Sequence, residues 1–249
     1  MNVTWRFRRA VAATLLVACA VIGTHITAAE RSSAETGRGA AADREDLPAV
    51  GWSPRFLFSE EPAMLILIDG SPVYRPIPET DLQRIVNTNA FIVRDDAGIH
   101  YLKLFDGWME AYSLTGTWSV AGVPPTGAEQ ALRPAVASNT ADLLRRGAAE
   151  QPAAATTLAA EPPVIFVSTE PAELIVTDGP PRFVTVAGTS LEYIENTTAH
   201  VFREPTDQEL YVLSSGRWSR AWTTDGPWEL VPASDLPADI AAIQAALRK

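Results

Sequence analysis

The chain has 249 residues, of which 47% are hydrophobic and 8% aromatic, which is enough for one large domain or two small ones. Its 30 acidic and 20 basic residues give a formal net charge of −10, and this excess of negative charge excludes nucleic acid and anionic membrane surfaces as favoured partners. The single cysteine, Cys19, excludes an internal disulfide, so packing must hold the fold together.

Residues 1–29 have the three parts of a secretory signal peptide. Arg6, Arg8 and Arg9 precede an apolar run over 10–22, and small residues at 27–29 match a cleavage site. The apolar run has 13 residues. That is fewer than the roughly 20 that cross a membrane comfortably. The pattern predicts cleavage after Ala29 and export to the periplasm.

Two other interpretations of the leader stay open. Residues 16–19 read Leu-Val-Ala-Cys and fit a lipobox, in which Cys19 would be lipidated, although the residues after it stay apolar. An uncleaved leader would instead remain as an N-terminal anchor. Each version places the folded part outside the cytoplasm. It would be free in the periplasm, secreted, or attached to a membrane, and in the last case the leader or the lipid would be the attachment. The polar residues 30–53 predict a disordered linker.

An internal repeat is the strongest signal in the chain. At an offset of 109 residues, 61–94 aligns with 170–203 without a gap, and 15 of the 34 positions are identical. One inserted residue then moves the offset to 110, which aligns the tryptophans at 108 and 118 with those at 218 and 228. The chain is therefore predicted to contain two copies of one module, the first at 54–123 and the second at 163–233.

Each copy has the pattern of a small antiparallel β-module. Branched apolar runs at 65–68 and 174–176 end in Asp-Gly, which is typical of a hairpin turn. Pro72 and Pro181 follow two residues later, so the returning strand is expected at a sheet edge or with the proline as its first residue. About six short strands per copy, joined by tight turns, predict a mainly β fold with two tandem meander or barrel-like modules.

Short helices are expected outside the two modules. The Ala/Pro-rich linker at 124–162 can form a helix over 141–146, capped by Asn139 or Thr140 and ended by Gly147. Residues 234–249 predict a C-terminal helix with an apolar face that docks on a module, because Ile240, Ile243 and Leu247 have helical spacing.

Six aromatic residues are the candidate ligand-binding residues. Side chains four apart on a regular strand share a face, so two of these rings can form a platform that stacks on sugar rings. The alternative is that the rings fill the core, because a small module without disulfides needs large side chains there. Burial in the core is favoured for the four tryptophans that align with one another. For the other two residues, burial and exposure are weighed equally. The six are Trp108, Tyr112 and Trp118 in the first copy, and Trp218, Trp222 and Trp228 in the second; Trp218 and Trp222 are the proposed platform.

The duplicated polar residues favour a structural role. Asp69 and Asp178 directly precede glycine, as turn residues do. The Asn-Thr pairs at 87–88 and 196–197 lie at the ends of predicted strands. We expect their side chains to bond the backbone of the turn rather than a ligand.

Signals for catalysis are weak. His100 and His200 do not align between the copies and lack the spacing of metal ligands. The sequence has no Gly-x-Ser-x-Gly elbow, no phosphate-binding glycine loop and no HExxH motif. We therefore predict no catalytic residue, no metal and no cofactor.

The second copy also carries a longer pattern. It contains Asp-Gly at 178–179, Gly-Thr-x-Leu-x-Tyr-x-x-Asn-Thr at 188–197, Tyr-Val-Leu-x-Ser-Gly-Arg-Trp at 211–218 and Gly-Pro-Trp at 226–228. This pattern resembles the repeat of exported proteobacterial proteins that are often named carbohydrate-binding family V/XII-like, and the first copy has it in degenerate form. The resemblance implies export from a Gram-negative cell and glycan binding, and it supplies no catalytic residue.

These observations predict an exported, non-enzymatic binding or assembly module of the bacterial cell envelope. The expected partners are glycans or peptidoglycan, bound through aromatic residues, or envelope proteins. One alternative is a protein-interaction scaffold whose aromatic residues are buried. A more remote alternative is a hydrolase, which would require a cleft that brings His100 or His200 beside carboxylates.

Overall fold

The computed structural model describes residues 55–142, 144 and 157–247, without the side chains of 244–247. The predicted leader with Cys19, the predicted linker at 30–53 and much of the Ala/Pro-rich linker lie outside these residues. Within the described ranges the fold is mainly β, with sixteen strands, two α-helices and one short 3-10 helix. Neither α-helix has the length and apolar composition to cross a membrane, a result that concerns the described residues only.

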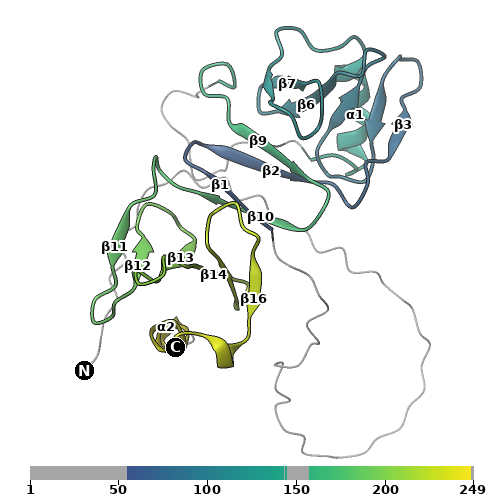
Figure 1. The fold of residues 1–249 in the computed structure, drawn as a ribbon. Coiled ribbons are helices and arrows are strands. Elements are labelled where there is room, and N and C mark those ends of the chain that lie inside the picture. Colours follow the sequence, from purple (N-terminus) through teal and green to yellow (C-terminus); the bar gives the residue numbers. More distant parts are fainter. Residues whose placement is uncertain (1–54, 143, 145–156, 248–249) are drawn as a thin grey trace, which may run out of the picture. The chain divides into compact units, whose positions relative to one another are not determined.

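Each module contains a six-stranded antiparallel sheet whose strands are neighbours in sequence order (Figure 1). The predicted meander is therefore confirmed, but neither sheet closes into a barrel. The edge position expected for the strands after Pro72 and Pro181 is also confirmed, because β3 and β11 are the first strands of their sheets. The first sheet consists of β3 (Tyr74–Pro76), β4 (Gln83–Ile85), β5 (Ile92–Arg94), β6 (His100–Leu104), β7 (Gly107–Ala111) and β8 (Ser119–Val120), and the second of β11 (Phe183–Thr185), β12 (Glu192–Ile194), β13 (His200–Arg203), β14 (Leu210–Ser214), β15 (Arg217–Ala221) and β16 (Glu229–Val231).

Four further strands pair across the two modules. β1 (Arg55–Ser59) runs parallel to β10 (Ala172–Val176), and β9 (Val164–Ser168) runs parallel to β2 (Ala63–Leu67). The predicted hairpins at the two Asp-Gly turns are therefore wrong. β2 and β10 pair with strands of the other module, and the Asp-Gly turns carry the chain to the edge of the following sheet.

Each six-stranded sheet is buried on both faces. One face packs against the strands that pair across the modules, and the other packs against the helix that follows the sheet. In the second module, Phe202 and Trp218 lie on the helix side, whereas Val201 and Val212 lie on the strand side. This alternation is what the period of two along a strand requires of a sheet with two buried faces.

Of the two helices predicted from the sequence, the one in the linker differs from the structure and the C-terminal one agrees with it. α1 (Ala128–Ala137) begins after Gly127, whose φ of 87° ends the preceding turn. The helix predicted over 141–146 is wrong at Ala141, Asp142 and residue 144, which are not helical. The amide of Ala141 donates to the carbonyl of Ala135 and that of Asp142 to Asn89, so this stretch is tied to α1 and to the sheet instead.

The C-terminal helix α2 (Ala238–Leu247) follows the 3-10 helix η1 (Ala233–Asp235). Ile240 and Ile243 are buried against the second sheet, as the helical spacing predicted, while the side chain of Leu247 lies outside the described part. Each sheet is thus followed by a helix that covers the same face, so the structural repeat is longer than the aligned sequence.

Candidate functional site

The two most exposed aromatic side chains among the described residues occupy equivalent positions in the two modules. Tyr112 is 88% exposed and Trp222 is 64% exposed. Each is the first residue after a strand, β7 or β15, and each opens the loop to the last strand of its sheet. Buried, half-buried and exposed residues follow the same order over 111–120 and 221–230. We call residues 112–118 and 222–228 the two aromatic loops.

Both aromatic loops are fixed by the same hydrogen bonds. The amide of Gly116 donates to the carbonyl of Ser113 over 3.1 Å, and Gly226 donates to Thr223 over the same distance. A buried tryptophan closes each loop, because the indole N–H of Trp118 donates to the carbonyl of residue 114 and that of Trp228 to residue 224, each over 3.2 Å. The exposed ring at the start of each loop therefore projects from a fixed backbone.

The other four candidate aromatic residues are buried. Their exposed fractions are 3% for Trp108, 8% for Trp118, 2% for Trp218 and 4% for Trp228. None of them offers a ring face to a ligand in solvent. The platform predicted from Trp218 and Trp222 is not formed, because β15 ends at Ala221 and the alternation of faces does not continue to position 222.

Trp108 shows how a buried ring is satisfied. Its indole N–H donates to the Glu129 carboxylate over 2.8 Å, and Lys103 lies 3.0 Å from the same oxygen. The hydrogen bond from Trp108 and the Lys103 ammonium hold the pKa of Glu129 below its usual value. These contacts join α1 to the sheet and mark a structural role.

The duplicated Asn-Thr pairs hold the turns, as expected. Asn196 is fully buried; its side-chain oxygen accepts from the amide of Arg182, and its amide group donates to the carbonyls of Asp178 and Pro180. Asn87 makes the same three bonds in the first module. The threonine beside each asparagine donates over 2.7 Å to the carbonyl of the last residue of β2 or β10, which is Leu67 in the first module and Val176 in the second. These contacts bind the side chains of the Asn-Thr pairs to the backbone of the protein and indicate a structural role.

The buried histidine belongs to a polar cluster that only the first module has. His100 Nε2 lies 2.8 Å from the Tyr74 hydroxyl, and the Arg94 guanidinium stacks 3.9 Å from the Tyr74 ring centre. Burial, followed by the charge of Arg94, lowers the pKa of His100 below 6.5, against smaller opposing effects of the Ala111 carbonyl and Asp95.

The equivalent positions of the second module show what is essential in this cluster. Arg203 stacks 3.6 Å from the ring centre of Phe183 and pairs with Glu192, while a leucine takes the place of the histidine. The arginine on a ring is therefore common to both modules, and the Tyr74–His100 bond is an addition to it. Neither His100 nor the exposed His200 forms a hydrogen bond or ion pair with a carboxylate of the described residues.

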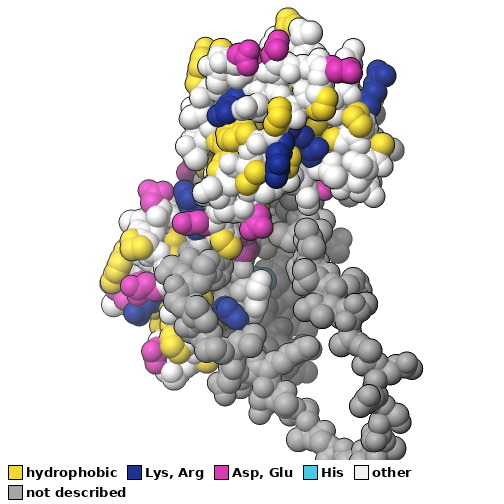
Figure 2. All heavy atoms as spheres, turned by 90° about the vertical axis from the view of Figure 1, so that its right-hand side faces the viewer, with side chains coloured by type: hydrophobic (Ala, Val, Ile, Leu, Met, Phe, Trp, Pro, Cys, Tyr) yellow, Lys and Arg dark blue, Asp and Glu magenta, His cyan; other side chains and the backbone are white. Residues whose placement is uncertain are grey.

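A recess of about 300 Å³ in the first module was not foreseen from the sequence. Arg75 and Arg84 line it together with apolar residues such as Val86 and Pro134, and none of its lining residues is acidic. Arg84 is held there by its hydrogen bonds to Thr140 and by the Phe91 ring 5.1 Å away. Figure 2 shows basic and hydrophobic side chains together on this module. The second module has valine and tyrosine at the two arginine positions, so no repeat pattern could have signalled the recess.

Carboxylates line another recess of the first module, of about 500 Å³, with Glu79, Asp81, Asp95 and Asp96 among its residues. Within the described ranges, no three His, Cys, Asp or Glu side chains come together as a metal site would require.

Comparison with known proteins adds no family assignment. No protein-family model matches the chain, and no curated protein matches it either.

Proposed function

We propose that this protein is an exported, non-enzymatic binding module of the bacterial cell envelope that recognises neutral glycans through Tyr112 and Trp222. The observation that carries the proposal is the exposure of these two rings at equivalent positions, while the other four candidate rings are buried. Export rests on the leader pattern at 1–29.

The aromatic loops have the chemistry of a sugar site. A flat ring stacks on the apolar face of a pyranose, and nearby hydroxyl and carboxylate groups can bond its hydroxyls. The second loop presents Thr223 and Asp225 at exposed positions beside Trp222, and the first presents Ser113 and Thr117 beside Tyr112. The formal net charge of −10 favours neutral glycans over acidic polymers.

Two equivalent rings on one chain fit a polymeric ligand. A glycan strand repeats the same sugar face, so one strand that reaches both loops would bind more tightly than a short fragment. We expect long oligosaccharides to bind more tightly than their disaccharide units.

The test is calorimetric titration of the chain beginning at Glu30 with soluble neutral glycans and muropeptides. We expect saturable binding that is lost in the Tyr112→Ala, Trp222→Ala double variant at unchanged melting temperature. The matched control exchanges the two residues, Tyr112→Trp with Trp222→Tyr, and should keep binding because both rings remain. Binding that survives the double alanine variant would place the site elsewhere, and no binding to any glycan would remove the glycan proposal.

A protein-interaction scaffold is the second candidate. Val73 and Val86 are 42% and 45% exposed, and their backbones are joined by a hydrogen bond of 3.0 Å. Val86 also lines the recess that holds Arg75 and Arg84. An apolar surface beside two arginines that form no ion pair with a carboxylate of the described residues suits an envelope protein with an acidic segment. Loss of a captured partner in Val86→Asp, but not in Trp222→Ala, would favour this candidate.

A further inference from the structure

The first strand of each module lies in the other module, and the two exchanges are equivalent. In register, Arg55 pairs with Ala172 in one exchange and Val164 with Ala63 in the other. All four positions are related by the repeat offset of 109 residues. The bonds at the ends repeat as well, because the carbonyl of Ser59 accepts from Thr177 and that of Ser168 from Ile68, each over 2.9 Å.

A module cannot fill this position with its own first strand. If β1 paired with its own β2 in the register that β9 uses, Ser59 would lie beside Leu67, while Ala63 lies at the far end of β2. Only residues 60–62 connect the two strands. They would have to cover roughly 14 Å, the diagonal of about 13 Å along the strand and about 5 Å across to its neighbour, which is also about the full reach of four extended links. No length remains for the two reversals, and parallel neighbours normally need a dozen or more connecting residues.

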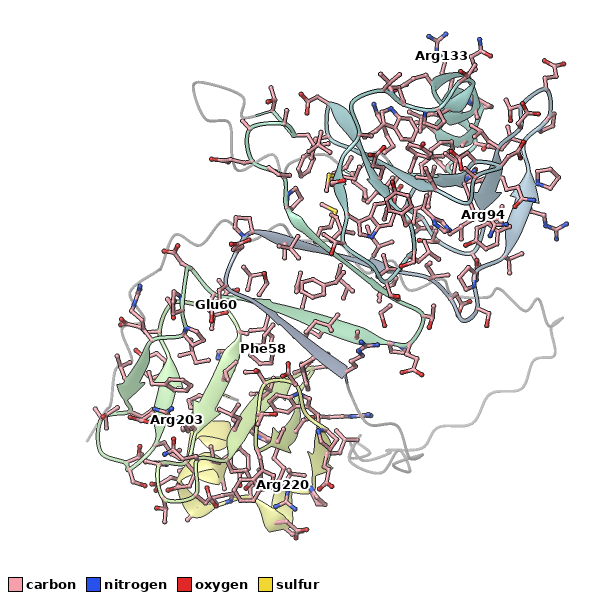
Figure 3. The ribbon with its side chains drawn as sticks, turned by 45° about the horizontal axis from the view of Figure 1, so that its top comes forward. Phe58, Glu60, Arg94, Arg133, Arg203 and Arg220 are labelled. Carbon is pink, nitrogen blue, oxygen red and sulfur yellow. The ribbon has the colours of Figure 1, made fainter. Side chains whose placement is uncertain are left out.

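The exchanged strands are part of the cores they enter. Phe56 packs edge-on against Trp228 with ring centres 5.0 Å apart, and Phe58 stacks on the same indole. Figure 3 labels Phe58 on the exchanged strand β1. In the other exchange, Ile165 and Val167 belong to the core of the first module. The second and fourth residues of each strand therefore supply the apolar side chains, and the fifth is serine in both.

We propose that β2 and β10 are strand-acceptor sites, which only the first strand of another copy of the module can fill. In this chain the tandem copy fills each site, so neither module is complete by itself. The occupant is an extended segment that runs parallel to the acceptor, with large apolar residues at its second and fourth positions. Once β1 is disabled, the site on β10 is open to the same strand of a second molecule. This inference does not depend on glycan binding.

The first experiment uses the full chain with Phe56→Asp and Phe58→Asp, which removes the apolar side chains of β1 and leaves β9 in place. The probe is a fluorescent peptide with the sequence of residues 55–60. We expect saturable binding to this variant, with a rise in its melting temperature, and at least tenfold weaker binding to the wild-type chain, whose site is filled. A peptide with Asp at both Phe positions is the matched control and should not bind. A folded variant that ignores the peptide would overturn the proposal.

A second experiment tests the strand exchange even if that variant does not fold. In a full chain with Cys19→Ser, we place cysteines at Leu57 and Leu174, which are neighbours in register. Parallel neighbours lie about 4.8 Å apart, within the reach of a disulfide. We expect oxidation to give a cross-linked monomer. The control pair, Leu57→Cys with Leu65→Cys, would be neighbours only if β1 folded back on its own module, and it should stay reduced. Cross-linking of the control pair in place of the first pair would overturn the exchange.

Discussion

Phe58, in the first strand of the first module, stacks on the indole of Trp228 near the end of the second, with ring centres 6.0 Å apart and planes 13° from parallel. Phe56, two residues earlier, meets the same indole at 70°. One buried tryptophan thus joins the beginning of one repeat to the end of the other. The core of the second module depends on residues that lie outside its own sequence.

The first prediction concerns this joint. Phe56 is 4% exposed, and Phe56→Ala should lower the free energy of unfolding by about 3–5 kcal/mol, as loss of a buried phenyl ring does. Denaturant titration followed by tryptophan fluorescence measures the change. Leu57→Ala, at a half-buried position of the same strand, is the control and should cost clearly less. Equal losses for the two variants would show that β1 does not present Phe56 to the core of the second module.

The sequence located the repeat and the order of strands within each sheet, because those features depend on neighbours in the chain. Asp-Gly turns and proline positions mark where strands begin and end, and these are local signals. The strand that pairs with β1 could not be predicted from the sequence. The alternation of Phe56 and Phe58 indicates that one face of β1 is buried, but it does not identify the element that this face packs against. Arg55 pairs with Ala172 because the connection at 60–62 is too short for β1 to pair with β2 of its own module. That comparison of lengths can be made only once the register of the strands is known.

The aromatic residues show the same limit at the candidate site. Trp218 and Trp222 are four positions apart, and a continuous strand would have placed them on one face. β15 ends at Ala221, so one ring is in the core and the other in solvent. The last residue of β15, Ala221, pairs with Leu210 of β14, and the spacing of the tryptophans in the sequence does not show where this pairing ends.

The second prediction separates these two tryptophans. Trp222→Ala should change the free energy of unfolding by no more than about 0.5 kcal/mol, as surface substitutions do. Trp218→Ala should lower it by about 3–5 kcal/mol, because it removes a buried indole. Thermal and denaturant unfolding of the two variants beside the wild type provide the measurement. A large loss in Trp222→Ala would mean that its ring packs against the protein in solution and is not free to stack on a ligand.

The third prediction concerns the asparagine that holds the turn of the second module. Asn196→Ala leaves the amide of Arg182 and the carbonyls of Asp178 and Pro180 without their partner, and it should cost about 1–3 kcal/mol. Asn87→Ala removes the same three bonds at a half-buried site, where water can replace them, so its cost should be smaller. If the two variants lose equal stability, burial of the turn is not what sets the cost.

The last prediction concerns pH. Burial and Arg94 lower the pKa of His100 in the folded state below 6.5, the ordinary value, so the unfolded chain binds the proton more readily. The contribution of this residue to stability is therefore complete above pH 6.5 and is lost as the pH falls from there toward the folded-state pKa. Unfolding free energies measured by denaturant titration from pH 7.5 to 5.5 should decline in the wild type.

The control for that decline takes residues from the second module. Tyr74→Phe with His100→Leu installs the side chains found at Phe183 and Leu210, and it removes the titrating group without leaving the tyrosine hydroxyl unpaired. The decline over this interval should be shallower in the double variant. His200→Gln, which removes an exposed histidine, should keep the wild-type slope. A wild-type slope in the double variant would assign the pH dependence to other groups and show that His100 is protonated as easily in the fold as in the unfolded chain.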